Sequence, residues 1–120
     1  MPRKPIRKTL VKNLDKAVSE YIRRRDKRCV QCGTVENLTN GHIFTRKNYS
    51  TRWDVSIDGN CHTQCWPCNY RHGSDQWPYF RWYIKKFGQK KFDQLRRRHK
   101  EVKKYKDFDL EELLKQVKNI

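Results

Sequence analysis

Cys29-Val30-Gln31-Cys32 and Cys65-Trp66-Pro67-Cys68 are the two stretches that decide the fold of this chain. Each is a Cys-x-x-Cys pair, a spacing that places two sulfurs on one side of a metal ion while backbone N–H groups point toward them. Two such pairs in a small basic chain predict a tetrahedral four-thiolate zinc site. Because four sulfurs leave no open coordination position, we expect this zinc to be structural and not catalytic.

The fifth cysteine, Cys61, lies four residues before Cys65 in a segment that the sequence favours as a strand. It is most simply a small buried apolar residue, and it is also the obvious substitute if one of the four expected ligands is wrong. An odd number of cysteines favours metal binding over disulfides in a reducing compartment. No apolar run approaches the ~20 residues of a membrane span, and residues 1–8 do not suit a signal peptide. We therefore expect no membrane contact and a cytoplasmic location.

The charge of the chain is its second strong signal. Its 120 residues include 29 Lys and Arg against 13 Asp and Glu, a net charge of +16 that four thiolates and one Zn²⁺ would lower to +14. Such a field attracts polyanions, of which nucleic acid is the commonest, although a ribosome-associated protein or a merely soluble basic surface would have the same charge. Only 35% of residues are apolar, so we expect a small, aromatic-rich core that the metal helps to stabilise.

Changes in pattern divide the chain into four segments. Residues 1–8 combine two prolines with four basic residues and suit an extended arm. Residues 9–28 are the segment of an amphipathic helix, which is predicted from residue 10 to about residue 26 because apolar residues from Leu10 to Ile22 recur at helical spacing after an N-cap at Thr9. Residues 29–75 hold the zinc site, and residues 76–120 predict a helical extension. We expect one α+β domain in which a small zinc-bound core is flanked by α-helices.

Within the core, Asn37–Phe44 and Trp53–Ile57 are predicted as short strands and loops, and a helix is predicted from Pro67. A strand pair followed by a helix would bring the two cysteine pairs together. The next helix is expected to end at Gly88, and another to include Phe92 and Leu95. The expected core stripe of the first of these two helices is Trp77, Phe80, Ile84 and Phe87; Tyr79, Trp82 and Trp66 lie off it and could either pack or stack on unpaired bases.

A last helix is predicted to begin with Asp109 as N-cap and Glu112 as its capping-box partner. Phe108 is expected to pack on Leu113 as a hydrophobic staple. The expected buried stripe of this helix is Leu110, Leu113, Leu114 and Val117.

The residues around the cysteines resemble a known family. Gly41-His42, Asn60, Cys65-x-x-Cys68-Asn69 and His72, in this order after the first cysteine pair, resemble the zinc-stabilised HNH endonucleases. Within that superfamily, Gly41-His42-Ile43-Phe44, Ser50-Thr51-Arg52-Trp53-Asp54 and Asn60-Cys61-His62-x-Gln64-Cys65 are similar to phage recombination proteins of the NinG (Rap) type. The resemblance covers roughly residues 29–95. It implies a ββα-metal (HNH or His-Me finger) core, in which a β-hairpin and a helix surround one divalent cation.

The resemblance implies a metal-dependent DNA endonuclease acting on branched recombination intermediates such as Holliday junctions and D-loops. His42 would be the general base that takes a proton from the attacking water, which suits a side chain that titrates near neutral pH. Asn60 would hold the site loop and this histidine in place. Asn69 would bind a catalytic Mg²⁺ or Mn²⁺, and His72, three residues along the same predicted helix, could complete the ligation.

One position departs from the family. Many HNH enzymes have Asp or His as a metal ligand immediately before the catalytic histidine, whereas this chain has Gly41, which has no side chain to offer. The cation would then need another partner, for which His62, Asp54, Asp58 or a water are the candidates.

Each of these residues also has a purely structural explanation. His42 could be a satisfied structural histidine, and Asn60 could simply shape a turn. Asn69 could do no more than begin a helix, while His62 and His72 could be hydrogen-bonding neighbours of the zinc.

Basic residues near the expected core are candidates for phosphate contact, which gives affinity without reading the base sequence. They can equally be solvated faces at the C-termini of helices. His99 is expected to be part of such a basic face. The candidate DNA-binding residues are Arg23, Arg24, Arg25, Arg46, Lys47, Arg52, Arg96, Arg97 and Arg98.

Other functions fit part of the pattern. A non-catalytic zinc-ribbon module that binds nucleic acid or a ribosome needs the cysteines and the charge but has no use for His42, Asn60 and Asn69. A homing-type or toxin HNH nuclease is a third candidate. A phage protein of the NinG type would act in the host-cell cytoplasm, with a homodimer as one candidate assembly because a junction resolver nicks two strands. A phage recombinase or annealing protein is a further candidate partner.

Overall fold

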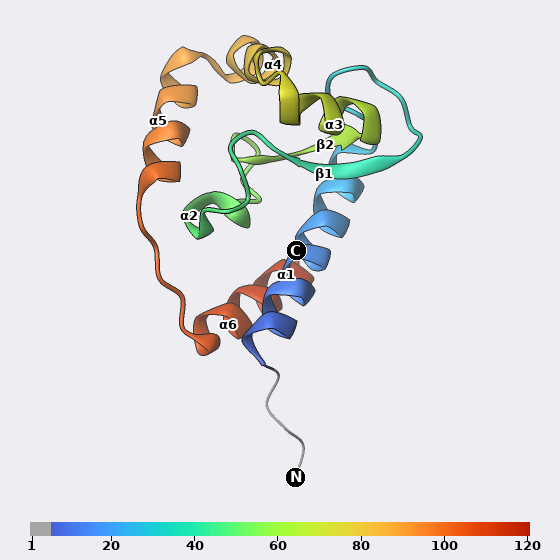
Figure 1. Ribbon diagram of the computed structural model, residues 1–120. Helices are drawn as coiled ribbons and strands as arrows, with labels where there is room; N and C mark the ends of the chain where they lie inside the picture. Colours follow the sequence, from blue (N-terminus) through green and yellow to red (C-terminus); the bar gives the residue numbers. More distant parts are fainter. Residues whose placement is uncertain (1–5) are drawn as a thin grey trace.

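A short antiparallel sheet lies at the centre of the chain, and helices surround it (Figure 1). The computed structural model describes residues 6–120, and within them the chain forms six helices and one two-stranded sheet, which is the predicted α+β class. None of these helices is long and apolar enough to cross a membrane. In chain order the elements are α1 (Arg7–Asp26), β1 (Leu38–His42), α2 (Tyr49–Arg52), β2 (Cys61–Cys65), α3 (Trp66–Ser74), α4 (Trp77–Phe87), α5 (Gln89–Lys100) and α6 (Asp107–Lys118).

The strands pair in a register that places His42 opposite Cys61 and Leu38 opposite Cys65. Because α3 begins directly after β2, the predicted order of strand, strand and helix is present. The predicted strand segment Trp53–Ile57 is instead a turn and loop after the short helix α2. The physical reason lies in Trp53, whose indole is buried against α1 and donates a hydrogen bond there in place of joining a sheet.

Alternate residues of the sheet face opposite layers, because side chains along a strand point to opposite sides. On one side, Thr63 Oγ1 donates to a backbone carbonyl of α1 at 3.0 Å, and Cys61 belongs to the apolar cluster around α1. On the other side, His62 contacts aromatic rings of α4. Asn40 and His42 lie opposite Thr63 and Cys61, so these two side chains share the α1 side of the sheet.

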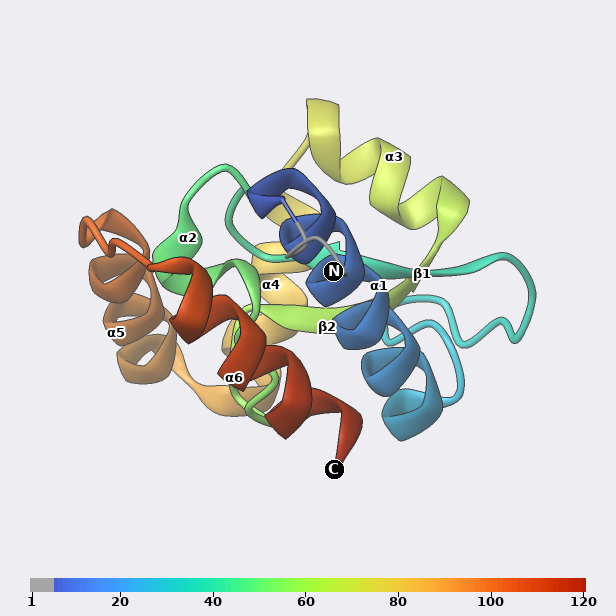
Figure 2. The ribbon, with the colours of Figure 1, turned by 90° about the horizontal axis from the view of Figure 1, so that it is seen from below.

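α1 and α6 lie side by side and share one apolar cluster (Figure 2). α1 begins at Arg7 with Ile6 as N-cap, before the predicted Thr9, and ends at Asp26 as predicted. Residues 1–5 of the predicted arm lie outside the described residues, and the remaining positions Arg7 and Lys8 are helical. The apolar stripe predicted for α1 is confirmed, with Leu10, Leu14, Ala17, Val18 and Ile22 buried.

The core stripe predicted for α4 is confirmed in part, since Phe80, Ile84 and Phe87 pack against the second apolar cluster but Trp77 is exposed. Trp77 is 58% exposed, whereas Tyr79 and Tyr83 are each only 1% exposed. Both phenols reach backbone carbonyls: Tyr79 Oη donates to Gly41 O at 2.8 Å, and Tyr83 Oη donates to Asp58 O. A buried phenol needs such a partner, and these carbonyls come from segments far away in the sequence. The aromatic pattern alone therefore could not identify the buried side of α4.

The start of α6 also differs from the prediction. Lys106 is the N-cap residue, and its backbone N–H donates to Asp109 Oδ2 at 2.9 Å. Asp109 is thus the capping-box partner and not the N-cap. Glu112, the predicted partner, lies one turn further along the helix and takes no part in the cap. Phe108 is 67% exposed, so the predicted staple with Leu113 is wrong.

His99 is a further correction, since it is not part of an exposed basic face. Its ring is stacked on Phe44, with centroids 5.2 Å apart, and its Nδ1 lies 3.0 Å from Thr51 Oγ1. Its backbone carbonyl accepts hydrogen bonds from Asn48 Nδ2 at 2.8 Å and Ser50 Oγ at 3.0 Å. His99 therefore joins the end of α5 to the loop and helix that follow β1.

Candidate functional site

Four sulfur atoms meet where the first cysteine pair approaches the junction of β2 and α3. The Sγ atoms of Cys29, Cys32, Cys65 and Cys68 all lie within 4.8 Å of one another, and those of Cys32 and Cys65 are 3.6 Å apart. Sulfurs bound about 2.3 Å from one tetrahedral zinc are spaced by about 3.8 Å. The cluster is therefore able to hold a metal ion and is compatible with structural zinc, as the sequence predicts.

Backbone hydrogen bonds shape the first half of this cluster. Gly33 N donates to Cys29 O at 2.9 Å, and Cys29 N donates to Thr34 O at 2.9 Å, which closes a tight turn. Gly33 has a φ of +81°, a conformation that favours glycine. Val30 N donates to Thr63 O at 2.9 Å and attaches the turn to β2. The second half needs no separate loop because Cys65 ends β2 and Cys68 lies in the first turn of α3.

The charge balance of the cluster favours a cation. Burial raises the pKa of the Cys29 thiol, but backbone N–H groups of Cys32 and Cys65 outweigh burial and lower this pKa to about 7. Burial and the neighbouring Cys65 thiol both raise the pKa of Cys68. One thiolate therefore opposes ionisation of the next, and all four can ionise together only around positive charge, which Zn²⁺ supplies.

Cys61 lies outside this group of four. Its buried thiol donates to Arg52 O at 3.4 Å, and burial raises the pKa of the thiol to about 12. The position of Cys61 thus supports its interpretation as a buried apolar residue and not as a substitute zinc ligand.

His42 ends β1 with one ring nitrogen tied to the backbone. His42 Nε2 lies 3.0 Å from the carbonyl oxygen of Arg52. Because a carbonyl only accepts, Nε2 carries the proton, and the lone pair of the neutral ring is on Nδ1. None of residues 6–120 forms a hydrogen bond with this Nδ1. Burial lowers the pKa of His42, so the ring is neutral and able to accept a proton at pH 7.

The carbonyl that fixes His42 is itself held by an ion pair. Asp15 on α1 accepts hydrogen bonds from Arg52 Nε at 2.9 Å, Arg52 Nη2 at 2.6 Å and Trp53 Nε1 at 2.8 Å. Burial raises the pKa of the Asp15 carboxyl, but the hydrogen bonds from Arg52 and Trp53 outweigh burial and lower it overall. Asp15 is thereby ionised and anchors the backbone to which His42 donates.

Asn60 connects the loop after β1 to the segment before β2. Its Oδ1 accepts from Phe44 N at 2.8 Å, and its Nδ2 donates to Phe44 O at 2.9 Å and to Thr51 O at 3.3 Å. The side chain is fully buried. Asn60 therefore lies in a position to fix the loop that follows His42, and its amide has no free group with which to touch a substrate.

Asn69 and His72 lie on α3 one turn apart and attach this helix to β1. Asn69 Nδ2 donates to Thr39 Oγ1 at 2.9 Å, which leaves Oδ1 as a free acceptor. His72 Nε2 donates to Ile43 O at 2.9 Å, so its lone pair is on Nδ1, which is buried without a partner among the described residues. An orphaned buried acceptor is unusual and points to a missing donor or cation.

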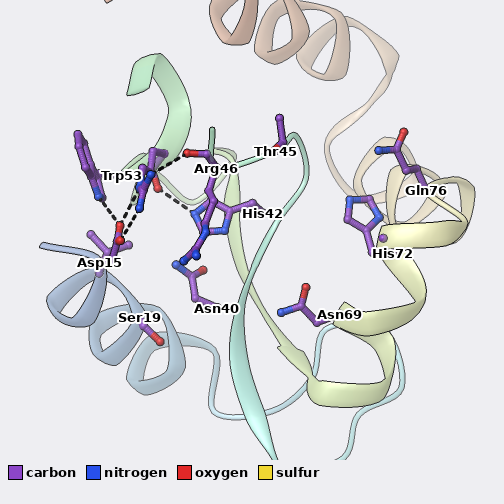
Figure 3. A pocket seen from close by; sticks show the side chains of 13 residues that line it. Asp15, Ser19, Asn40, His42, Thr45, Arg46, Trp53, Asn69, His72 and Gln76 are labelled. Carbon is purple, nitrogen blue, oxygen red and sulfur yellow. Dashed lines mark hydrogen bonds and ion pairs between the residues drawn. The ribbon is translucent and has the colours of Figure 1, made fainter. Parts of the chain in front are cut away.

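These side chains surround one pocket of about 550 Å³. Figure 3 shows β1 between α1, which carries Asp15, and α3, which carries Asn69 and His72. Asn40 and His42 line the pocket from β1. The structure thus brings together three of the predicted site residues, His42, Asn69 and His72.

The other predicted cation partners lie elsewhere. His62 is on the opposite side of the sheet and does not line the pocket; its Nε2 donates to Gly59 O at 2.7 Å, and burial lowers its pKa to about 4. Asp54 pairs with Arg98 at 3.2 Å, and Asp58 pairs with Lys91 at 3.1 Å. None of these three residues lines the pocket, so the geometry does not support the expectation that one of them completes the cation site.

The predicted DNA-binding residues fall into two groups. Arg25 donates to Val55 O at 3.0 Å and to Cys61 O at 3.1 Å, and Arg52 pairs with Asp15, so both guanidinium groups serve the fold. Arg23 bonds within α1, and Arg98 pairs with Asp54. The exposed members without a hydrogen bond or ion pair from their side chains in the described chain are Arg24, Arg46, Lys47, Arg96 and Arg97, of which Arg24 lies over the Tyr21 ring and Arg46 lines the pocket.

Sequence reasoning missed two pocket residues, Asp15 and Asn40. Asn40 could have been found, since it lies two residues before His42 on a predicted strand and therefore on the same side. Asp15 carried no local signal, because its contact with Arg52 depends on how α1 packs against the rest of the chain.

The comparisons with known proteins give one match. A family model described as "Bacteriophage Lambda NinG protein" matches residues 3–119. No curated protein and no solved structure matches the chain. The matched range extends beyond the residues that carry the motif and includes both α1 and α6.

Proposed function

The chain belongs to the bacteriophage lambda NinG family, which is related to phage recombination, and from that premise we propose that it is a metal-dependent DNA endonuclease with an HNH-type ββα-metal core. The observation that carries the proposal is the state of His42. Its Nε2 is committed to a backbone carbonyl, so its basic Nδ1 is left in a pocket that also contains Asn69 and His72. A histidine with one nitrogen fixed and the other free is suited to act as a general base.

In the proposed reaction, a water molecule attacks the phosphorus of a DNA phosphodiester. His42 Nδ1 takes a proton from this water as the new P–O bond forms. The bond between phosphorus and the 3′ oxygen breaks, and the departing oxygen takes a proton from solvent. The products are a 5′-phosphate and a 3′-hydroxyl end, and His42 returns its proton to solvent.

Asn69 Oδ1 and His72 Nδ1 would hold the catalytic Mg²⁺ or Mn²⁺. Both are lone-pair donors without a partner in residues 6–120, and they come from one face of α3. A cation held there would polarise the phosphate and neutralise charge on the departing oxygen. A mixed oxygen and nitrogen donor set suits Mn²⁺ better than Mg²⁺, which prefers oxygen alone.

The proposed substrate is branched DNA, such as a Holliday junction or D-loop. Support comes from the family and from the net charge of +16, which favours a protein that grips duplex arms through phosphates. Arg46, which lines the pocket, and the exposed Lys47 follow β1, and Arg96 and Arg97 lie exposed on α5. Contacts of this kind give affinity without sequence specificity.

A second candidate function is a non-catalytic zinc-ribbon module that binds nucleic acid. The cysteine cluster and the charge favour it as strongly as they favour a nuclease. It gives no reason, however, for the fixed tautomer of His42 or for the orphaned Nδ1 of His72.

The test is cleavage of labelled three- and four-way junctions with Mg²⁺, Mn²⁺ or EDTA, comparing the parent with His42→Ala. We expect the parent to cut with a divalent cation, faster with Mn²⁺, and His42→Ala to be slower by about 10²- to 10⁴-fold. Added imidazole should restore part of the lost rate. Junction affinity should be unchanged by the substitution and should fall steeply with salt.

His99→Ala is the matched control, because it removes an imidazole that contacts only protein groups. Any fall in the cleavage rate of this variant should be explained by its lower stability, and added imidazole should not restore the rate. If the parent binds junctions but never cuts them with either cation, the enzyme proposal is wrong and the zinc-ribbon module is favoured. If His42→Ala cuts as fast as the parent, the role given to His42 is wrong.

A further inference from the structure

Asn40 presents an acceptor that nothing in the described chain satisfies. Its Oδ1 is buried and has no hydrogen-bond partner in residues 6–120. Only two other side-chain atoms of the described chain share this state, and one of them is His72 Nδ1 in the same pocket. Leaving a buried acceptor unpaired opposes folding, so a polar residue at this position requires an explanation.

The location of Asn40 suggests that explanation. Asn40 and His42 are two residues apart on β1, so their side chains leave the strand on the same side and both line the pocket (Figure 3). The residue between them cannot contribute, because a Cβ at Gly41 would collide with the side chain of Gln64 on the opposite side of the sheet. Asn40 is therefore the nearest polar neighbour that β1 provides for His42.

The chemistry of the two groups is matched to a single water molecule. His42 Nδ1 and Asn40 Oδ1 are both acceptors, and a cation or a water is needed to join two acceptors. A water has two O–H donors, so a single water placed between these two acceptors in the pocket can donate to both. With both of its hydrogens engaged, this water has a lone pair free to point toward a phosphorus atom in the pocket.

We propose that Asn40 is a second catalytic residue, which accepts a hydrogen bond from the attacking water and orients it while His42 removes the other proton. This inference rests on the nuclease function proposed above and adds one contact to it. Oδ1 gains and loses no proton in the step, so the bonds made and broken are unchanged. Asn40 would not bind the cation, which is assigned to Asn69 and His72 on α3.

The test compares Asn40→Leu, which keeps the volume but removes the acceptor, with Asn40→Asp, which keeps an acceptor oxygen. Single-turnover junction cleavage at saturating protein is measured together with junction affinity, the Mn²⁺ concentration for half-maximal rate, and the melting temperature. We expect Asn40→Leu to cut about 10- to 100-fold more slowly and Asn40→Asp to keep most of the parent rate. Junction affinity and the Mn²⁺ midpoint should stay at the parent values in both variants.

Stability distinguishes this role from a structural one. If the role of Asn40 Oδ1 is to bind water, Asn40→Leu removes a buried group that has no partner in the described chain. The melting temperature of this variant should then equal or exceed that of the parent. Ser19→Ala is the control, because Ser19 lines the same pocket from α1 away from β1, and its rate should stay within about twofold.

Each other outcome overturns the inference in a recognisable way. If the parent and His42→Ala behave as expected but Asn40→Leu cuts at the parent rate, Asn40 has no role and the nuclease proposal stands. If Asn40→Leu raises the Mn²⁺ midpoint, Asn40 is a cation ligand and not a water acceptor. A fall in rate that accompanies a fall in melting temperature assigns Asn40 to the fold. A parent that never cuts overturns both proposals.

Discussion

Asp15 holds one wall of the pocket through Arg52 and Trp53. Its carboxylate accepts three hydrogen bonds from Arg52 and Trp53, and the backbone carbonyl of Arg52 in turn accepts the proton of His42 Nε2. The Arg52 carbonyl sets the tautomer of His42, and Asp15 on α1 helps to hold Arg52 in place. The orientation of His42 is therefore sensitive to changes in the ion pair of Asp15 and Arg52.

We predict that Asp15→Asn lowers the free energy of unfolding at pH 7 by about 1–2 kcal/mol, because it removes a charged partner of Arg52 at a partly exposed position. The pKa of Asp15 is lowered in the folded state, so its contribution is present above the unfolded pKa and is lost as the pH falls through the folded pKa. Urea unfolding at pH 7 and at about pH 3 measures the difference between variant and parent.

The control for this prediction is Asp93→Asn on the exposed surface of α5. Its stability should differ little from that of the parent at either pH. A deficit in Asp15→Asn that is the same at both pH values would mean that lost packing, and not lost charge, explains it.

The candidate site was predictable where it rests on local spacing. His42, Asn69 and His72 follow from the motif, and the structure places all three at one pocket. The role of Asn60 as a loop anchor was implied by the resemblance, and its hydrogen bonds to Phe44 agree with it. Asp15 could not be predicted, because 37 residues separate it from Arg52 and only tertiary packing joins them.

At the scale of elements, helix positions follow from apolar periodicity, but helix starts and some buried faces do not. α1 ends at Asp26, where its periodic pattern predicts. The most buried residues of α4, Tyr79 and Tyr83, were not predicted, because their phenols are buried through hydrogen bonds to distant carbonyls. The segment around Cys61 is a strand as expected, but Trp53–Ile57 is not, because Trp53 packs against α1 and does not join the sheet.

The cap of α6 offers a sharp test of register. Asp109 Oδ2 accepts from Lys106 N, whereas Glu112 makes only a 3.4 Å exposed ion pair with Lys115. We predict that Asp109→Ala lowers the free energy of unfolding by about 0.5–2 kcal/mol, while Glu112→Ala changes it by less than about 0.5 kcal/mol. Chemical denaturation of both variants measures these values, and the reverse ranking would restore the cap predicted from the sequence.

At the scale of the whole molecule, the cysteine cluster ties together parts of the chain that are distant in sequence. It joins the turn after α1 to the junction of β2 with α3, and α3 carries the two proposed cation ligands. Three of the four cysteines form a small buried cluster of their own, apart from the two larger apolar clusters. With so little apolar area around it, we expect this part of the fold to depend on a metal.

We predict one tightly bound zinc per chain, whose removal by a strong chelator unfolds the protein. Cys68→Ser should lose both the zinc and the far-UV circular dichroism of the fold, because a ligand is missing. Cys61→Ser is the matched control and should keep one zinc, since Cys61 lies outside the cluster. Elemental analysis gives the zinc content, and a zinc-free parent that remains folded would contradict the structural role of the metal.

The pairing of α1 with α6 has a consequence for biosynthesis. Leu14 on the first helix and Leu110 on the last belong to the same cluster, so a nascent chain makes one of these surfaces almost 100 residues before the other. At roughly 5–20 residues per second on the ribosome, the delay is about 5–20 seconds. During that time the hairpin and the cysteine cluster can assemble, but the first helix stays partly uncovered, and a chaperone that recognises apolar helices has an interval in which to bind it.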